Sequence, residues 1–335
     1  MKIILASSER FSGSIIAALE RRGHRVVGVV SPARGIYNSR FRGWRNWFYE
    51  LRQWDVIKRC RKGGIEFRVC RRLDEGSLIS FIKNAKPDLL LLFGWPNLVG
   101  ERTLSLFPFG GMNIHPSLLP LGRGPDPLFS LIDSGQSGFG ISYHRVVGEL
   151  DAGPLYFQSP LIRLSRDTYD RLYFRLIEGI HHGINRAVDS LLRNPEGVPQ
   201  RGEPSYVGRF RKSHRFLDPA RPLDAEIRRT RACYSHHSRI SACNGVLFYF
   251  STAREEVAFD PVCDRHAAIQ QRGGFSLILR WGGRYLQLGG IRFYGKPRWM
   301  TPFLLAIHCR PGAVLESRAR VRELWRSART AAINA

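Results

Sequence analysis

Segments with strand and helix patterns alternate along the first 160 residues of this chain. Short apolar runs such as Lys2–Ala6 and Arg25–Val30 have the length of strands, and Ser12–Arg22 carries apolar residues at helical spacing before Gly23. Alternation of this kind predicts an α/β fold with a doubly wound, mostly parallel sheet, whose ligands bind at the carboxyl ends of the strands. The other expected elements here are strands at 65–70, 88–93, 111–115 and 140–147 and helices at 75–84 and 167–192.

The pattern changes after residue 204. Residues 193–204 are rich in Pro, Gly and Asn, which is typical of a linker. A short helix at 225–232 and β-like runs at 245–252, 275–280 and 284–293 come next. Because 335 residues suit two domains better than one core, we expect an α/β domain over 1–192, a linker over 193–204 and a smaller β-rich domain over 205–335.

The charge of the chain is strongly positive and unevenly distributed. Lys and Arg number 52 against 28 Asp and Glu, which gives a formal net charge of +24. Residues 1–72 carry +12 and residues 201–335 carry +14, whereas residues 73–160 carry −3. The two basic ends favour a polyanionic partner. A solvated basic surface without a partner fits the same numbers.

The stretch 34–49 interleaves arginines with aromatic residues. The arginines are Arg34, Arg40, Arg42 and Arg45, and the aromatic residues are Tyr37, Phe41, Trp44, Trp47, Phe48 and Tyr49. Arginine binds phosphates and aromatic rings stack on bases, so the stretch suits a single-stranded nucleic-acid end. The alternative is that its aromatic residues begin the following helix and pack on the core.

Membrane and secreted classes fit this chain poorly. Its longest apolar run, around Leu89–Phe93, is about six residues against the roughly 20 that a membrane-spanning helix needs. The apolar stretch at the N-terminus is too short for a signal peptide. Six scattered cysteines without a C-x-x-C pair indicate neither a zinc site nor a disulfide framework. We therefore expect a cytoplasmic protein with free thiols and no metal site.

Three polar residues carry the chemistry. Asn113 and His115 lie two positions apart on an expected strand that ends at Pro116, so both face one side near its carboxyl end. An Asn amide can donate to an oxyanion, and a His can polarise a carbonyl or move a proton. Asp151, in the tight turn 148–154, can orient the His or accept a proton from an amine. Asn-x-His alone fits a structural pair, but its combination with the acidic turn favours a catalytic site.

The segment Asn113–Pro125 and the turn Leu150–Pro154 resemble those of formyltransferases that use 10-formyltetrahydrofolate. That family acts on glycinamide ribonucleotide, methionyl-tRNA or amino sugars, and includes formyltetrahydrofolate deformylase. The resemblance implies a Rossmann-like domain in which Asn113, protonated His115 and Asp151 are catalytic. It further implies a folate pocket formed by Leu92, Phe93, Gly94, Trp95, Pro96 and Asn97 and by Gly148, Glu149 and Leu150.

Residues 205–218 and 227–232 are similar to the junction into the C-terminal domain of methionyl-tRNA formyltransferases. This weaker resemblance implies an OB-like C-terminal domain and methionyl-tRNA as the acceptor. The tRNA would contact the loop 34–49 and the basic C-terminal domain. The acceptor-binding residues expected on these grounds are Arg40, Arg42, Trp44, Arg45, Arg123 and Asp126.

The chain also departs from the family pattern. Asp126 stands where an Ala-Ala-Pro or Pro-Ala-Pro segment is usual, residues 233–237 replace a Trp-Pro-Gly-type ending, and the loop 34–49 lacks the usual Lys-rich run. A small amine such as a nucleotide-linked amino sugar is therefore the alternative acceptor. A non-catalytic RNA-binding protein on the same scaffold is a remoter alternative.

Overall fold

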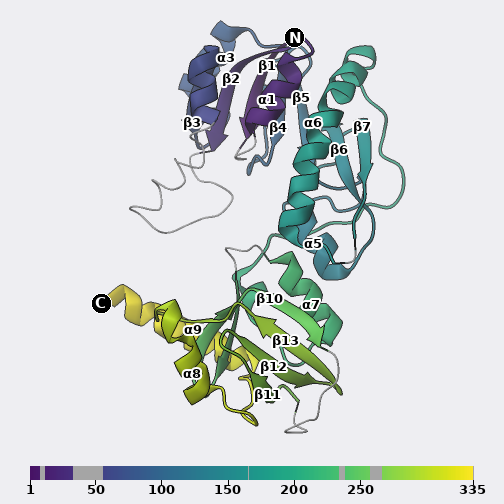
Figure 1. Ribbon diagram of the computed structural model, residues 1–335. Coiled ribbons are helices and arrows are strands. Elements are labelled where there is room, and N and C mark those ends of the chain that lie inside the picture. Colours follow the sequence, from purple (N-terminus) through teal and green to yellow (C-terminus); the bar gives the residue numbers. More distant parts are fainter. Residues whose placement is uncertain (8–11, 33–55, 165, 234–237, 257–265, 335) are drawn as a thin grey trace. The chain divides into compact units, whose positions relative to one another are not determined.

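The computed structural model describes residues 1–7, 12–32, 56–164, 166–233, 238–256 and 266–334 (Figure 1). The chain divides into two compact units, which interleave along the sequence. The N-terminal unit consists of residues 1–127, 138–163 and 173–208, and the C-terminal unit of residues 128–137, 164–172 and 209–335. The domain boundaries expected at residues 192 and 204 stay a prediction.

A seven-stranded sheet forms the N-terminal unit, with strand order β3-β2-β1-β4-β5-β6-β7. The strands from β3 to β5 are parallel, and β6 and β7 run antiparallel to their neighbours. The predicted doubly wound, mostly parallel sheet is confirmed. The strands are β1 Lys2–Ser7, β2 Arg25–Pro32, β3 Glu66–Cys70, β4 Leu89–Phe93, β5 Gly111–His115, β6 Phe139–Arg145 and β7 Leu155–Leu161.

Apolar sequence explains the centre of this sheet. Ile3–Ala6 of β1 and Leu89–Phe93 of β4 are buried throughout, as strands covered on both faces must be. The helices along residues 1–193 are α1 Ser12–Glu20, α3 Gly76–Ala85, α4 Glu101–Leu104, α5 Pro127–Ser134 and α6 Tyr169–Arg193. Of these, α5 after its first residue and the start of α6 fall in the C-terminal unit. α6 lies beside α1, and a hydrogen bond from Asn185 Nδ2 to the Ala18 carbonyl, 3.0 Å long, joins the two helices.

The ends of β4 and β5 lie side by side in the middle of the sheet. Phe93 pairs with Ile114 across the parallel ladder, one residue before β5 ends at His115. β6 runs back along the other edge of β5 and pairs His144 with Asn113. The polar residues of β5 therefore lie between the carboxyl end of a parallel neighbour and a histidine of an antiparallel one.

The C-terminal unit is built from two antiparallel sheets. One has the strand order β10-β13-β12-β11 (Figure 1), and the other has the order β14-β9-β8. The predicted β-rich character of this region is confirmed, and its OB-like nature stays a prediction. The strands are β8 Arg239–Cys243, β9 Val246–Phe250, β10 Thr252–Glu256, β11 Ile269–Arg272, β12 Ser276–Trp281, β13 Arg284–Gly289 and β14 Arg292–Phe293. The helical elements are η1 Lys212–Arg215, α7 Leu223–Ala232, η2 Arg298–Met300, α8 Thr301–His308 and α9 Arg318–Asn334.

Candidate active site

The three predicted catalytic residues come together at the carboxyl end of β5. Asn113 and His115 lie on β5, and Asp151 lies in the turn between β6 and β7. Asn113 Nδ2 donates to Asp151 Oδ1 at 3.2 Å, and His115 Nδ1 lies 3.6 Å from Asp151 Oδ2. The backbone N–H of Gly124 donates to the same Oδ2 at 2.9 Å. One carboxylate thus contacts the amide, the imidazole and the loop that follows β5.

Two glycines allow this close approach. A Cβ on Gly153 would lie 1.9 Å from the Arg145 carbonyl oxygen, so no other residue fits this part of the turn. Gly124 has φ +117° and a Cβ there would lie 2.3 Å from the Val207 carbonyl oxygen. Asp151 itself has φ +51°, a left-handed conformation that is uncommon outside glycine. Gly124 and Gly153 therefore let the loop after β5 and the turn between β6 and β7 approach each other around the Asp151 carboxylate.

Sequence reasoning missed His144, which completes the cluster. The ring is 3% exposed, and its Nε2 accepts from Asn113 Nδ2 at 3.1 Å and lies 3.5 Å from Asp151 Oδ1. Its Nδ1 faces the Arg145 carbonyl oxygen at 2.8 Å, so the proton of the neutral ring belongs on Nδ1. The available signal was the position of His144 on an expected strand, but only the β5–β6 register places it opposite Asn113.

The pKa of Asp151 lies well below its ordinary value. Burial by itself would raise this pKa, but contacts with His144, His115 and the Gly124 N–H lower it to about 2. The Gly124 N–H donates to the carboxylate, and a proton on either histidine nitrogen that faces it would favour the charged form. Asp151 is therefore an anion throughout the neutral range and holds a proton only weakly.

The pKa of His115 is lowered, because burial penalises the imidazolium more than Asp151 favours it. The ring is 4% exposed, and its Nε2–H donates to the Gly122 carbonyl at 2.9 Å. A neutral His115 then presents its Nδ1 lone pair toward Asp151. The direction of this shift favours the neutral ring, and the protonated His115 expected from the sequence stays a prediction.

Arg123 joins the loop after β5 to the Asp151 turn. Its guanidinium donates to Glu149 Oε1 at 3.0 Å, to the Tyr206 hydroxyl at 3.1 Å and to Gln200 Oε1 at 2.9 Å. The amide of Gln200 donates in turn to the carbonyls of Asp151 at 2.8 Å and Gly153 at 2.9 Å. Gln200 and Tyr206 were not foreseen. Arg123 is 8% exposed, and these contacts hold its guanidinium against the turn.

The expected folate segments lie next to this cluster in the fold. Leu92 and Phe93 end β4 and are buried, while Gly94, Trp95 and Pro96 are half-buried and Asn97 is exposed. The Trp95 indole N–H is buried without a partner among the described residues, which leaves a donor for a heteroaromatic ligand. On the turn, Gly148, Glu149 and Leu150 are exposed. An apolar wall with one free N–H fits a pterin ring. The role of these nine residues stays a prediction.

Several expected acceptor residues lie outside the described residues. These are Arg40, Arg42, Trp44 and Arg45, together with the whole loop 34–49. Asp126 is described and half-buried, two residues after the Gly124 N–H that binds Asp151. Its contact with an acceptor stays a prediction, as does that of Arg123.

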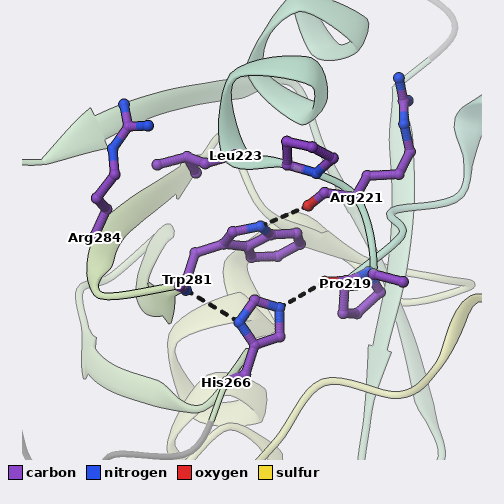
Figure 2. A pocket seen from close by; sticks show the side chains of 9 residues that line it. Pro219, Arg221, Leu223, His266, Trp281 and Arg284 are labelled. Atoms are coloured by element: carbon purple, nitrogen blue, oxygen red, sulfur yellow. Dashed lines mark hydrogen bonds between the residues drawn. The ribbon is translucent and has the colours of Figure 1, made fainter.

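The C-terminal unit contains a separate hollow of about 490 Å³ (Figure 2). The Trp281 indole donates to the Arg221 carbonyl at 2.9 Å, and His266 accepts from the Gly282 N–H at 3.1 Å. Arg284 on its rim pairs with Asp224 and Glu255. None of the expected site residues lines this hollow, and its polar groups satisfy one another, so it is not the candidate site.

The Rossmann-like sheet presents Asn113 and His115 at the carboxyl end of its central strand β5, with Asp151 beside them from the turn after β6, which places the chain among α/β domains that bind ligands at the ends of their strands. Residues 1–188 match the family model described as formyl transferase. This chain belongs to the formyl transferase family.

Named relatives agree with this membership. The methionyl-tRNA formyltransferase of Thermotoga maritima is 30% identical over 178 residues, which cover 53% of this chain and 54% of the relative. That of Pseudothermotoga lettingae is 31% identical over 237 residues, covering 69% and 72% of the two chains. The match thus spans about half the length of the first of these relatives and nearly three quarters of the second.

Solved structures share the fold. HypX from Aquifex aeolicus in complex with tetrahydrofolic acid has a TM-score of 0.60 at 16% identity, covering 96% of this chain and 46% of HypX. A sugar N-formyltransferase from a Shewanella species has a TM-score of 0.53 at 17% identity, covering 69% of this chain and 87% of that one. At these identities the likeness concerns the fold alone.

Proposed function

We propose that this chain transfers the formyl group of 10-formyltetrahydrofolate to a primary amine, with the amino group of methionyl-tRNA as the favoured acceptor. The observation that carries the proposal is the contact of Asp151 with both Asn113 and His115, at 3.2 and 3.6 Å. Membership in the formyl transferase family and the names of the relatives support it. HypX, which shares the fold, has been solved with tetrahydrofolic acid.

Asn113 would act on the formyl oxygen. The acceptor nitrogen attacks the formyl carbon, a new C–N bond forms, and the carbonyl oxygen becomes an oxyanion. Asn113 divides its N–H groups between His144 and Asp151, so it would exchange one of these bonds for the oxyanion. A donor of this kind is worth about 10²–10³ in turnover, because its bond strengthens as the charge develops.

His115 and Asp151 would handle the proton. The attacking amine must lose a proton, and the folate nitrogen must gain one when its bond to the formyl carbon breaks. A neutral His115 can accept that proton and pass it on, and the neighbouring Asp151 carboxylate stabilises the imidazolium that forms. Asp151, with a pKa of about 2, is a weak base and would act chiefly through its charge.

The acceptor is inferred from charge and from the relatives. The N-terminal 72 residues and the C-terminal 135 residues carry +12 and +14, and an RNA substrate is a polyanion. Relatives named methionyl-tRNA formyltransferase favour the same acceptor. Asp126, close to the cluster in sequence and unusual for the family, instead favours a small amine such as a nucleotide-linked amino sugar.

An acceptor screen tests the proposal. The purified chain is incubated with 10-formyltetrahydrofolate and either methionyl-tRNA or nucleotide-linked amino sugars, and the formylated product is quantified. We expect methionyl-tRNA to be formylated, and His115→Ala and Asp151→Asn to lower turnover at least about a hundredfold while the melting temperature stays close to that of the parent. Formylation of no amine, or near-normal turnover in either variant, would contradict the assignment.

A further inference from the structure

Helix α8 and the turn before it expose an unusual row of apolar side chains. Trp299, Phe303 and Ile307 are 69%, 66% and 56% exposed. Phe303 and Ile307 lie four residues apart on α8, a spacing that places them on one face of the helix, and Trp299 lies in the short 3-10 turn η2 that precedes it. We call Trp299, Phe303 and Ile307 the α8 ridge.

The opposite face of α8 already fills the core of the C-terminal unit. Thr301, Leu305 and Cys309 are fully buried, and they are offset from the ridge by two residues, about 200° around a helix. α8 also packs beside β14, where the rings of Phe293 and His308 lie 6.3 Å apart. Packing within the unit therefore uses only the inner face. An outward row of large apolar residues of this kind marks an interaction surface.

Positive charge borders the α8 ridge. Lys296 and Arg298 precede it and Arg310 follows it, all exposed. Arg298 lies over the ring of Phe275, itself 39% exposed, at 5.3 Å. Residues 266–315 contain seven Lys or Arg and no Asp or Glu. The exposed charges that flank the ridge in sequence are therefore positive, and a carboxylate, Glu316, lies near the C-terminal end of α8, where it accepts from the N–H of Gly245 next to Asn244, which donates to the His308 carbonyl at 2.8 Å.

We infer that the α8 ridge is a docking surface for an anionic lipid bilayer. A helix face of Trp, Phe and Ile flanked by Lys and Arg suits the boundary between acyl chains and headgroups. The exposed cations that flank the ridge in sequence, Lys296, Arg298 and Arg310, complement a negatively charged plane. Stacking on RNA would use Trp299 and Phe303 but leave Ile307 unexplained. The observations thus favour the bilayer.

Vesicle binding tests this inference with the full chain. Sedimentation with phosphatidylcholine vesicles containing phosphatidylglycerol should recover the protein, and pure phosphatidylcholine vesicles should recover far less. Phe303→Ser combined with Ile307→Ser should lower partitioning about a hundredfold, since each apolar side chain contributes about tenfold. Lys296→Ala combined with Arg310→Ala should lower it about fivefold per cation.

Matched variants separate the ridge from general effects. Leu164→Ser removes an apolar side chain that is 54% exposed elsewhere in the C-terminal unit, and Arg322→Ala with Arg326→Ala removes two exposed cations of α9. Both should keep vesicle partitioning within about threefold of the parent. Melting curves verify that the ridge variants are folded.

Three results would overturn the inference. The first is equal recovery with charged and neutral vesicles, or no recovery with either. The second is a ridge variant that loses affinity for single-stranded RNA but keeps its vesicle binding, which identifies an RNA surface. The third is a parent that sediments as a dimer and a ridge variant that sediments as a monomer, which identifies a second copy of this chain as the occupant.

Discussion

The side chain of Gln200 is hydrogen-bonded to the backbone of the turn that contains Asp151. Its amide donates to the carbonyls of Asp151 and Gly153, and its oxygen accepts from Arg123. Because Asp151 has a positive φ of 51°, its turn needs partners that fix it. Gln200 follows α6 in the sequence. Its hydrogen bonds therefore link the last segment of the N-terminal unit to the turn that carries the candidate catalytic carboxylate.

Replacing Gln200 should therefore impair formyl transfer without unfolding the chain. Gln200→Ala removes both donors, so the Asp151 carboxylate loses its orientation, and we expect kcat to fall about tenfold with KM for the folate donor changed less than threefold. Tyr206→Phe is the matched control, because it removes a hydroxyl bonded to Arg123 and Glu149 but leaves the Asp151 turn bonded. Equal losses in the two variants would contradict a positioning role for Gln200.

His144 should orient the Asn113 amide. His144→Phe keeps a ring of similar size but removes the Nε2 acceptor 3.1 Å from Asn113 Nδ2. A misdirected amide weakens oxyanion stabilisation, so kcat should fall about tenfold or more. His144→Gln, which restores an acceptor oxygen, should recover part of the loss. Steady-state kinetics of the two variants provide the comparison, and identical rates would show that the ring only fills space.

Acid should destabilise the C-terminal unit through His214. Burial, assisted by the charge of Arg229, lowers the pKa of His214 to about 4. Between pH 4 and the unfolded value near 6.5 the unfolded chain binds more protons, so the stability this group provides is present above pH 6.5 and is lost as the pH falls. Because the ring is only partly buried, we expect a loss on the order of 2 kcal/mol.

Urea unfolding at pH 7 and pH 4.5 measures this loss. His214→Gln keeps an acceptor for the Arg211 N–H, which His214 Nδ1 accepts at 3.0 Å, but cannot titrate. The variant should lose less stability than the parent between the two pH values. The shift of Asp151 acts only below pH 4, so it does not interfere. An identical loss in parent and variant would remove His214 from the explanation.

The strands that could be predicted from the sequence are those with a clear local pattern of apolar residues. β1 and β4 were predictable because Ile3–Ala6 and Leu89–Phe93 are unbroken apolar runs. β10, Thr252–Glu256, was missed because three of its five residues are charged, and β8 because it carries a buried arginine. That arginine, Arg239, is fully buried against Glu226, a pairing that no local pattern reveals.

The candidate site likewise contains residues that the sequence reveals and residues that only the folded structure reveals. Asn113, His115 and Asp151 were recognisable from their spacing and from the family motif, and the structure brings them together. His144 and Gln200 were not, because their contacts depend on strand register and on a segment interpreted as a linker. The burial that lowers the pKa of His115 is likewise a property of the whole sheet.

Salt dependence should distinguish the two acceptors. If the acceptor is tRNA, Arg42, Arg45 and the basic C-terminal residues neutralise phosphates, and each neutralised phosphate releases counterions. The apparent affinity for tRNA should then fall steeply with salt, with a log–log slope of several units. Arg42→Ala combined with Arg45→Ala should flatten that slope by up to about two units, one for each lost contact.

The formyl donor serves as the internal control in the same titration. Its expected pocket lies in residues 73–160, whose net charge is −3, so its KM should change little with salt. The double variant Arg322→Ala with Arg326→Ala, on α9, tests the C-terminal unit in the same way. It shows whether cations there contribute to the salt slope of tRNA affinity as those of the loop 34–49 are expected to. A nucleotide-linked amino sugar has too few phosphates for a steep slope. If the KM of the acceptor is nearly constant from low to physiological ionic strength, tRNA is excluded and a small amine is the substrate. The proposed formyl-transfer chemistry of Asn113, His115 and Asp151 is the same for either acceptor.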